Sequence, residues 1–202
     1  MTVILGLTGG IATGKSTVSD YFKELKIPVV DADVGSRAIV EPGTEGLKKI
    51  VEHFGEKILK LDGTLDRKKL GEIVFNDTEQ LKKLDSILEK NIRKWILKQM
   101  NDYLKLTPSL IVLDIPLLYE KNYLSEVDLV MVIATSKETQ LSRLMKRDQL
   151  TRKAAELRIA SQFPIENKME QANVVIDNND SIFSTKRQVY AWLIENNFLE
   201  KV

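Results

Sequence analysis

Short apolar runs alternate along the chain with segments whose apolar residues recur every three or four positions. The runs suit buried strands, and they cover residues 3–7, 28–30, 110–113, 129–134 and 174–176. The segments between them have the spacing of amphipathic helices, as in the sets Val18, Tyr21, Phe22 and Leu25; Leu141, Leu144 and Met145; and Val189, Trp192 and Leu193. Strands that alternate with helices predict an α/β fold, in which helices cover both faces of a parallel sheet.

One long segment breaks this alternation. Residues 43–107 contain no convincing strand run, and their apolar residues follow helical spacing. We therefore predict a single domain made of a core, residues 1–42 and 108–202, and an all-helical insertion between the second and third strands. Asp66 is expected to cap a helix over residues 67–75. The insertion either binds a substrate or is a structural elaboration without a site.

The first predicted strand runs into a glycine-rich segment with a specific spacing. Residues 9–16 match the pattern G-x-x-x-x-G-K-[ST], the phosphate-binding loop (P-loop) of ATP- and GTP-using enzymes. Lys15 would reach the β- and γ-phosphates, and the Ser16 hydroxyl would bind Mg²⁺. The alternative is an ordinary glycine-rich turn between a strand and a helix. The residues expected to bind ATP are Gly10, Ile11, Ala12, Thr13, Gly14, Lys15, Ser16 and Thr17.

Acidic residues follow the other predicted strands, where ligands of an open parallel sheet bind. Asp31 and Asp33 follow the second strand, Asp114 follows the third, and residues 177–178 (Asp-Asn) follow the last. If the second strand continues, Asp31 and Asp33 face the same side, one as a proton acceptor and the other holding a metal-bound water. The alternative for Asp33 is a helix cap. Asp114 would hold Mg²⁺ through water, as a Walker-B carboxylate does, or it forms a turn before Pro116.

A cation-rich stretch follows the fourth strand. Arg143 and Arg147 are four residues apart on a predicted helix and so share a face. Residues 145–153 are expected to form a lid that brings these arginines to a transferring phosphoryl group. The alternative is a solvated charged face, and we prefer that interpretation for Lys146 and Lys153.

Composition narrows the classes of function. The chain is 43% hydrophobic and 29% charged, with a formal net charge of +1 and no cysteine. The charge gives no reason to expect nucleic acid as a partner, and thiol chemistry is excluded. No apolar run approaches the length of a membrane span, and no signal peptide pattern precedes the first strand, so we expect a cytoplasmic protein. The single histidine, His53, is interpreted as a helix-surface or packing residue.

The ordered set of these motifs resembles the dephospho-coenzyme A kinase family of P-loop kinases over nearly the whole chain. The matching positions include the phosphate loop with Leu7 and Thr8, then Asp31, Asp33, Arg37, Phe54, Gly55, Asp62, Gly63, Asp66, Arg67, Leu70 and Phe75, the segment 114–120, and then Gln140, Arg143, Arg147, Arg158, Ile159, Gln162, Lys168 and residues 175–178. The resemblance implies ATP-dependent phosphorylation of the ribose 3′-hydroxyl of dephospho-coenzyme A, with Mg²⁺, in a P-loop NTPase-type fold. It implies that Asp33 is the general base. No obligate protein partner and no membrane partner are indicated by the sequence. The residues expected to contact the acceptor are Asp31, Asp33, Arg37, Asp114 and Leu117.

The chain departs from the family pattern at three places. Ala12 replaces a glycine of the loop, which would be tolerable only if its φ is negative. Glu89 and Lys90 stand where a His-Pro pair is expected in the insertion, and Asn173 replaces an acidic residue.

Three other functions compete with this one. Another nucleoside or nucleotide kinase would share the loop, lid and Mg²⁺ and differ in its acceptor. A GTP-driven switch would need an Asp-x-x-Gly motif, which the chain lacks. A regulatory ATP-binding module would leave Asp33 and the lid arginines without a purpose.

Overall fold

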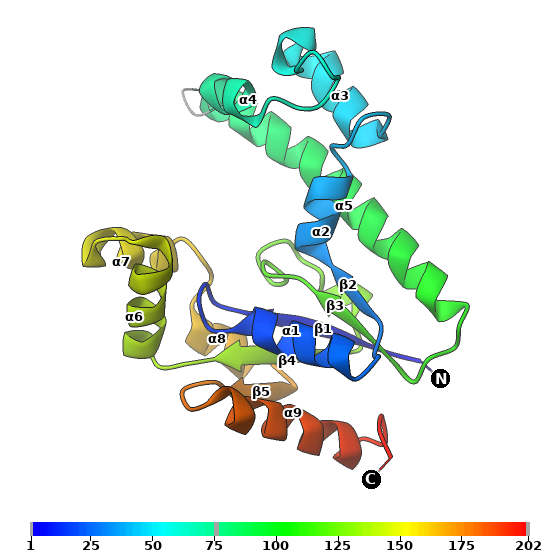
Figure 1. Cartoon of the computed structure of the whole chain (residues 1–202), viewed down its shortest axis with the longest axis vertical. Coiled ribbons are helices and arrows are strands. Elements are labelled where there is room, and N and C mark those ends of the chain that lie inside the picture. Colours follow the sequence, from blue (N-terminus) through cyan, green and yellow to red (C-terminus); the bar gives the residue numbers. More distant parts are fainter. Residues whose placement is uncertain (1, 75–76, 201–202) are drawn as a thin grey trace. The chain divides into compact units, whose positions relative to one another are not determined.

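The computed structural model describes residues 2–74 and 77–200, and within them the chain forms one five-stranded sheet (Figure 1). The order of the strands across the sheet is β2-β3-β1-β4-β5, and the pairs β1–β3, β1–β4 and β4–β5 are parallel. The strands are β1 (Val3–Gly9), β2 (Val29–Asp31), β3 (Leu110–Asp114), β4 (Leu129–Ala134) and β5 (Val174–Asp177). The α/β fold and all five predicted strands are confirmed, with ends that differ by at most two residues.

The described residues divide into two compact units. The first comprises Met1–Val30 and Asp102–Val202, and the second comprises Asp31–Asn101. The helices of the first unit are α1 (Lys15–Glu24), the 3₁₀-helix η2 (Leu124–Glu126), α6 (Lys137–Asp148), α7 (Arg152–Ala160), α8 (Ile165–Glu170) and α9 (Ile182–Glu195). Within the described ranges, no helix is both long enough and apolar enough to cross a membrane.

The core of the first unit lies between the sheet and helices α1 and α9, which run side by side (Figure 1). Leu5 and Leu7 of β1 point to this side and are completely buried with Phe22 of α1 and Leu193 of α9. Successive strand residues face opposite sides, so Gly6 points to the other face. A side chain there would meet Leu118, which follows β3. Strands β1, β3 and β4 are buried on both faces, as expected for the inner strands of a parallel sheet, whereas the edge strand β5 exposes Val175.

Helix α8 is attached to the segment after β3 by a buried ion pair. Lys168 has no exposed side-chain surface, and its Nζ lies 2.7 Å from Oε1 of Glu120. The same Glu120 oxygen accepts a hydrogen bond of 3.0 Å from the N–H of Phe163, just before α8. The hydroxyl of Tyr119 donates to the carbonyl of Lys168 at 3.2 Å. These contacts hold the segment that connects α7 to α8. The same segment contacts the phosphate loop through Gln162.

The second unit is helical apart from a single antiparallel bridge between Leu59 and Leu65 in its described residues. Its helices are α2 (Ala32–Ala38), α3 (Glu45–Phe54), η1 (Glu56–Ile58), α4 (Arg67–Val74) and α5 (Thr78–Leu104), the last of which ends beyond the unit. It has its own core around Ile50 and Ile58, both completely buried. This unit begins at Asp31, earlier than the insertion boundary expected from the sequence.

The predicted start of α4 is confirmed. Oδ1 of Asp66 accepts hydrogen bonds of 3.1 Å from the N–H groups of Lys68 and Lys69. These bonds lower the pKa of the Asp66 carboxyl below its usual value, with the Lys69 N–H as the largest cause. The predicted last residue of this helix, Phe75, lies outside the described residues. His53 lies exposed on α3 and hydrogen-bonds Gln80, which agrees with a surface role.

Candidate active site

The phosphate loop connects β1, which ends at Gly9, to α1, which begins at Lys15. The N–H of Thr13 donates to the carbonyl of Gly10 at 3.2 Å, so the loop turns back on itself. Gly14 stands at the N-cap with φ 93° and supplies no side chain to cap the helix. No N-cap side chain accepts from the first N–H groups of α1, and N–H groups at the positive end of a helix are suited to bind an anion.

The structure corrects our expectation for Ala12. Its φ is +60°, not negative, so an alanine occupies the left-handed conformation that a loop glycine would adopt freely. This conformation costs an L-residue about 1–2 kcal/mol. Ala12 packs with Ile11 against a small apolar cluster formed by Leu141, Leu144 and Ala155.

Lys15 and Asp114 form an ion pair beside the loop. The Nζ atom of Lys15 bonds Oδ1 of Asp114, the last residue of β3. The Asp114 side chain is 3% exposed and that of Lys15 is 13% exposed. A nearly buried carboxylate is thus held at the carboxyl end of β3, at the loop whose lysine is expected to bind phosphate. Ser16, by contrast, is exposed in the first turn of α1.

The loop is also held from the end of β5. Nδ2 of Asn178 donates to the carbonyl of Thr13 at 2.7 Å, and Oδ1 of Asn178 accepts from the Thr185 hydroxyl at 2.6 Å. A side chain on Gly14 would collide with the Asn178 amide. Asn178, which the sequence placed at this edge only by its position after a strand, is therefore part of the wall of the phosphate loop.

Asp31 and Asp33 do not share a strand face, and this premise of the sequence analysis is wrong. Strand β2 ends at Asp31, and Asp33 lies in the first turn of α2. Asp31 rather than Asp33 is the helix cap, because its Oδ1 accepts from the N–H groups of Asp33 at 2.9 Å and Val34 at 3.3 Å. Asp33 is exposed, and its carboxylate has no partner among the described residues. Arg37 is exposed on the same helix.

The two candidate lid arginines are placed differently, although both lie on α6. A guanidinium nitrogen of Arg143 lies 4.0 Å from where a Cβ of Gly14 would be, so Arg143 reaches the phosphate loop. Arg147 instead pairs with Asp148, with Nε–Oδ1 at 2.8 Å and Nη2–Oδ2 at 3.2 Å. The hydrogen bond to Asp148 raises the pKa of Arg147, and the same bond is the largest cause that lowers the pKa of Asp148.

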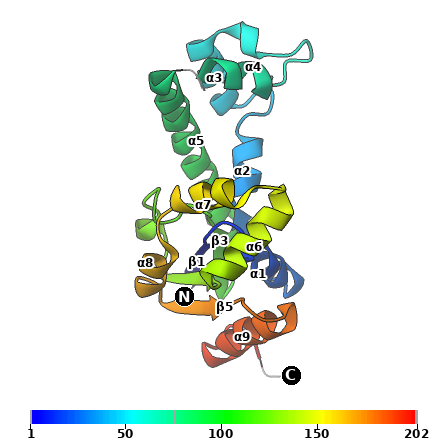
Figure 2. The ribbon, with the colours of Figure 1, turned by 90° about the vertical axis from the view of Figure 1, so that its left-hand side faces the viewer.

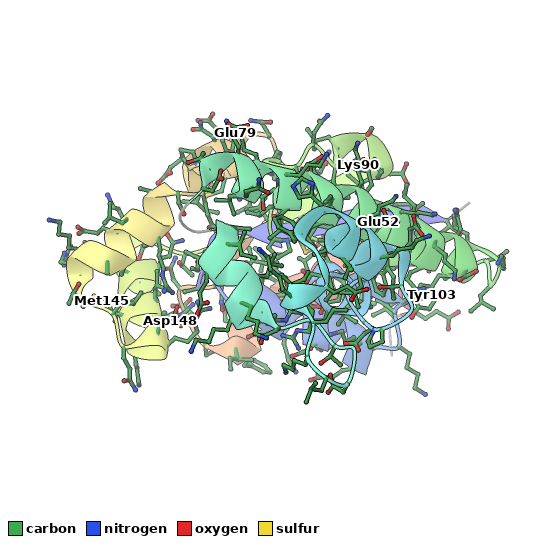
Figure 3. The ribbon with its side chains drawn as sticks, turned by 90° about the horizontal axis from the view of Figure 1, so that it is seen from above. Glu52, Glu79, Lys90, Tyr103, Met145 and Asp148 are labelled. Atoms are coloured by element: carbon green, nitrogen blue, oxygen red, sulfur yellow. The ribbon has the colours of Figure 1, made fainter. Side chains whose placement is uncertain are left out.

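The segment expected to form a lid is the tip of a helical hairpin. Helix α6 ends at Asp148 and α7 begins at Arg152, so only three residues connect them. Met145 and Asp148 lie on the last turns of α6 (Figure 3), and Nη1 of Arg158 on α7 bonds Oδ2 of Asp148 at 2.7 Å. Figure 2 shows α6 and α7 as neighbouring helices that pack against each other.

The remaining candidates are Leu117, the pair that departs from the family pattern in the insertion, and two lysines of the expected lid. Leu117 follows β3 and is 36% exposed. Glu89 and Lys90, which replace the family's His-Pro pair, lie within α5. Figure 3 labels Lys90 on this helix. Lys146 and Lys153 are exposed, in agreement with a solvated face.

Comparison with known proteins connects this site to a family. A family model described as dephospho-CoA kinase matches residues 3–184. Dephospho-CoA kinase of Listeria monocytogenes is 47% identical over 189 residues, which cover 94% of this chain and 94% of that protein. The protein of the same name from Bacillus anthracis is 47% identical over 200 residues, which cover 99% and 100%. The solved structure of dephospho-CoA kinase from Campylobacter jejuni aligns with a TM-score of 0.74 at 35% identity, covering 98% of this chain and 100% of that one. The resemblance read from the motifs is thereby confirmed, and the chain belongs to the dephospho-CoA kinase family.

Proposed function

We propose that this chain transfers the terminal phosphoryl group of ATP to the ribose 3′-hydroxyl of dephospho-CoA, giving CoA and ADP in the cytoplasm. The observation that carries the proposal is the phosphate loop of a family member, with open N–H groups at the start of α1 and Lys15 beside a buried carboxylate. In the reaction the acceptor oxygen bonds to the γ-phosphorus. The bond from the γ-phosphorus to the bridging oxygen breaks, and ADP leaves with both electrons of that bond.

The donor side of the site is assigned to the loop and α6. The N–H groups that begin α1 and the Lys15 ammonium would bind the β- and γ-phosphates of ATP. Arg143 lies close enough to the loop to neutralise charge on the transferring group. Arg147 is bonded to Asp148, so its guanidinium would have to leave that carboxylate before it could reach the phosphates. We assign this movement to the closing of the lid.

The acceptor side is assigned to the start of α2. Asp33 is exposed and unpaired within the described chain, so its carboxylate is available to take the proton from the ribose hydroxyl. Asp31 already accepts two backbone N–H groups, so we assign it the placement of α2 and a contact to the acceptor rather than proton transfer. Arg37, Asp114 and Leu117 complete the proposed acceptor contacts.

Magnesium fits the oxygen donors at the loop. The exposed Ser16 hydroxyl and the Asp114 carboxylate are hard ligands, and Mg²⁺ in such enzymes takes few protein ligands together with phosphate oxygens and water. We propose that Ser16 binds the ion directly and Asp114 binds it through water. When bound, the ion neutralises charge on the β- and γ-phosphates.

The test is a comparison of four acceptors with ATP and Mg²⁺: dephospho-CoA, adenosine, AMP and dCMP. We expect dephospho-CoA to react far faster than the others, because contacts remote from the hydroxyl position it. The new phosphate should appear on the ribose 3′-oxygen in ³¹P and ¹H NMR spectra. A preference for AMP or dCMP, or a phosphate on any other oxygen, would assign the chain to another nucleotide kinase activity.

A further inference from the structure

Two carbonyls of the phosphate loop accept hydrogen bonds from side-chain amides. Nε2 of Gln140, on α6, donates to the carbonyl of Ile11 at 2.9 Å. Asn178, after β5, donates to the carbonyl of Thr13 in the same way at 2.7 Å. The N–H of Ile11 is also taken, because it donates to Oε1 of Gln162 at 2.7 Å.

These bonds determine where other groups of the loop point. In a trans peptide the C=O of one residue and the N–H of the next point in opposite directions. A donor that holds the Ile11 carbonyl therefore directs the N–H of Ala12 to the opposite side. A donor that holds the Thr13 carbonyl does the same for the N–H of Gly14. These are N–H groups that a phosphate loop must direct inward at the anion.

We propose that Gln140 is a positioning residue, which holds the peptide between Ile11 and Ala12 so that the Ala12 N–H faces the phosphates of the nucleotide. Gln162 holds the preceding peptide through the Ile11 N–H, which for that reason is not a phosphate donor. Gln140 thus acts on the reaction through the backbone of the loop and touches no reacting atom.

Three features show that this contact is built into the fold. Gln140 is buried, with only 3% of its surface exposed. Its neighbours Leu141 and Leu144 on the same helix pack against Ile11 and Ala12. A side chain on Gly10 would approach Nε2 of Gln140 to 2.6 Å, so this glycine leaves room for the amide. Without the amide, the partly buried Ile11 carbonyl would lose the hydrogen bond that Gln140 donates to it.

The placement of Gln140 also connects the loop to the lid hairpin. Gln140 and Arg143 are three residues apart on α6, so they lie on neighbouring positions of one face. One side chain holds the loop backbone and the other reaches the start of α1. A displacement of α6 would therefore change the direction of a phosphate-binding N–H and the position of a phosphate-binding cation together.

The experiment compares Gln140→Met and Gln140→Glu with a matched control, Gln188→Met. Gln188 lies on α9 and bonds the backbone of Asp177 with both amide atoms, its Oε1 accepting from N–H at 3.0 Å and its Nε2 donating to the carbonyl at 2.7 Å. Methionine removes the amide and keeps the length of the side chain. Glutamate replaces the donor by an oxygen that the Ile11 carbonyl repels. Thermal unfolding monitors the loss of stability in each variant.

The specific readout is the amide proton of Ala12 in NMR spectra with and without MgADP. In the native protein this signal should move downfield when MgADP binds, because the N–H then donates to a phosphate. In Gln140→Met and Gln140→Glu we expect at least half of this change in chemical shift to be lost. We also expect MgADP affinity and kcat each to fall about 10-fold or more, because the Ala12 donor is misaligned. The KM for the acceptor should change less than about 3-fold, because the acceptor does not contact this peptide.

The proposal is overturned if the Ala12 signal moves as in the native protein, or if Gln140→Met and Gln188→Met affect MgADP affinity equally. The inference rests on the proposed function only in that the loop binds a nucleotide. MgADP binding does not involve the acceptor, so a wrong acceptor would leave this test unaffected.

Discussion

Replacing Lys15 should separate the catalytic use of its charge from the structural use. The Lys15 ammonium is paired with Asp114, whose side chain is 3% exposed. Lys15→Met keeps the side-chain stem and removes the charge. Removing one partner of a buried pair typically costs about 3–5 kcal/mol, and the further contacts of Asp114 place the expected loss at the lower end, about 3 kcal/mol. For a chain of this length that corresponds to a fall in Tm of about 6–12 °C.

The turnover should fall for a different reason. Lys15 is expected to stabilise the transferring phosphoryl group, and losing one preorganised donor costs about 10²- to 10³-fold in kcat. The double variant Lys15→Met with Asp114→Asn removes the buried charge, so its Tm should return to within about 3 °C of the native value, equivalent to about 1 kcal/mol. Its turnover should remain as low as that of the single variant or lower.

Thermal unfolding and steady-state turnover of the two single variants and the double variant complete this cycle. Lys23→Met, on the exposed face of the same helix, is the control: its pair with Asp20 is well exposed, so its loss should cost less than about 1 kcal/mol. An unchanged Tm for Lys15→Met would show that Asp114 does not depend on this lysine. Recovery of turnover in the double variant would show that Lys15 has only a structural role.

Four further predictions concern Asp33, Ala12, Asp148 and the lid. Asp33→Asn should lower kcat about 10²- to 10⁴-fold without changing Tm, whereas Asp31→Ala should lose a helix cap worth about 1 kcal/mol; a mild effect of Asp33→Asn on kcat would rule it out as the base. Ala12→Val should destabilise the protein in urea unfolding by about 2 kcal/mol, because a β-branched residue tolerates φ +60° poorly, while Ala12→Gly should stay within about 1 kcal/mol. The pKa of Asp148 is lowered mainly by the hydrogen bond that Arg147 donates to it. The ionised Asp148 carboxylate should therefore stabilise the fold fully at neutral pH, and this stabilisation should disappear as the pH falls through the lowered pKa. Equal pH dependence of Tm in Asp148→Asn and the native protein would contradict this. Hydrogen exchange over residues 145–153 should slow when ATP and the acceptor are both bound, and unchanged exchange in a saturated complex would argue against a lid.

The features that the sequence predicted correctly depend on local patterns. The five strands are continuous apolar runs, and an apolar run predicts a buried parallel strand without knowledge of its neighbours. The phosphate loop is a single uninterrupted motif, and its strand and helix lie directly beside it. Asp66 is followed immediately by the helix that it caps. In each of these cases the residues that cause the structure are within a few positions of one another.

The errors at Asp31 and Ala12 have different causes. Two residues at i and i+2 share a face only while a strand continues, and here the Asp31 carboxylate starts a helix by accepting the N–H groups of Asp33 and Val34. Ala12 packs against a cluster of residues from α6 and α7, which follow it by more than a hundred residues, and no pattern around Ala12 in the sequence contains that contact. Propensity alone would have required glycine.

The side-chain amides that bond the phosphate loop could not be predicted from local sequence patterns either, although they bear directly on function. Gln140 is 129 positions from Ile11, Gln162 is 151 positions from it, and Asn178 is 165 positions from Thr13. Glutamine and asparagine are common surface residues, and nothing in their surroundings in the sequence distinguishes these three from others. Their role appears only when the fold brings them to the outer side of a loop whose inner side must remain open to an anion. The motif specifies which backbone groups are available for phosphate, and these distant amides hold the peptides so that the groups face it. Gln140 and Gln162 are among the positions that match the family in order, so such matching positions can point to residues that act on a site through its backbone.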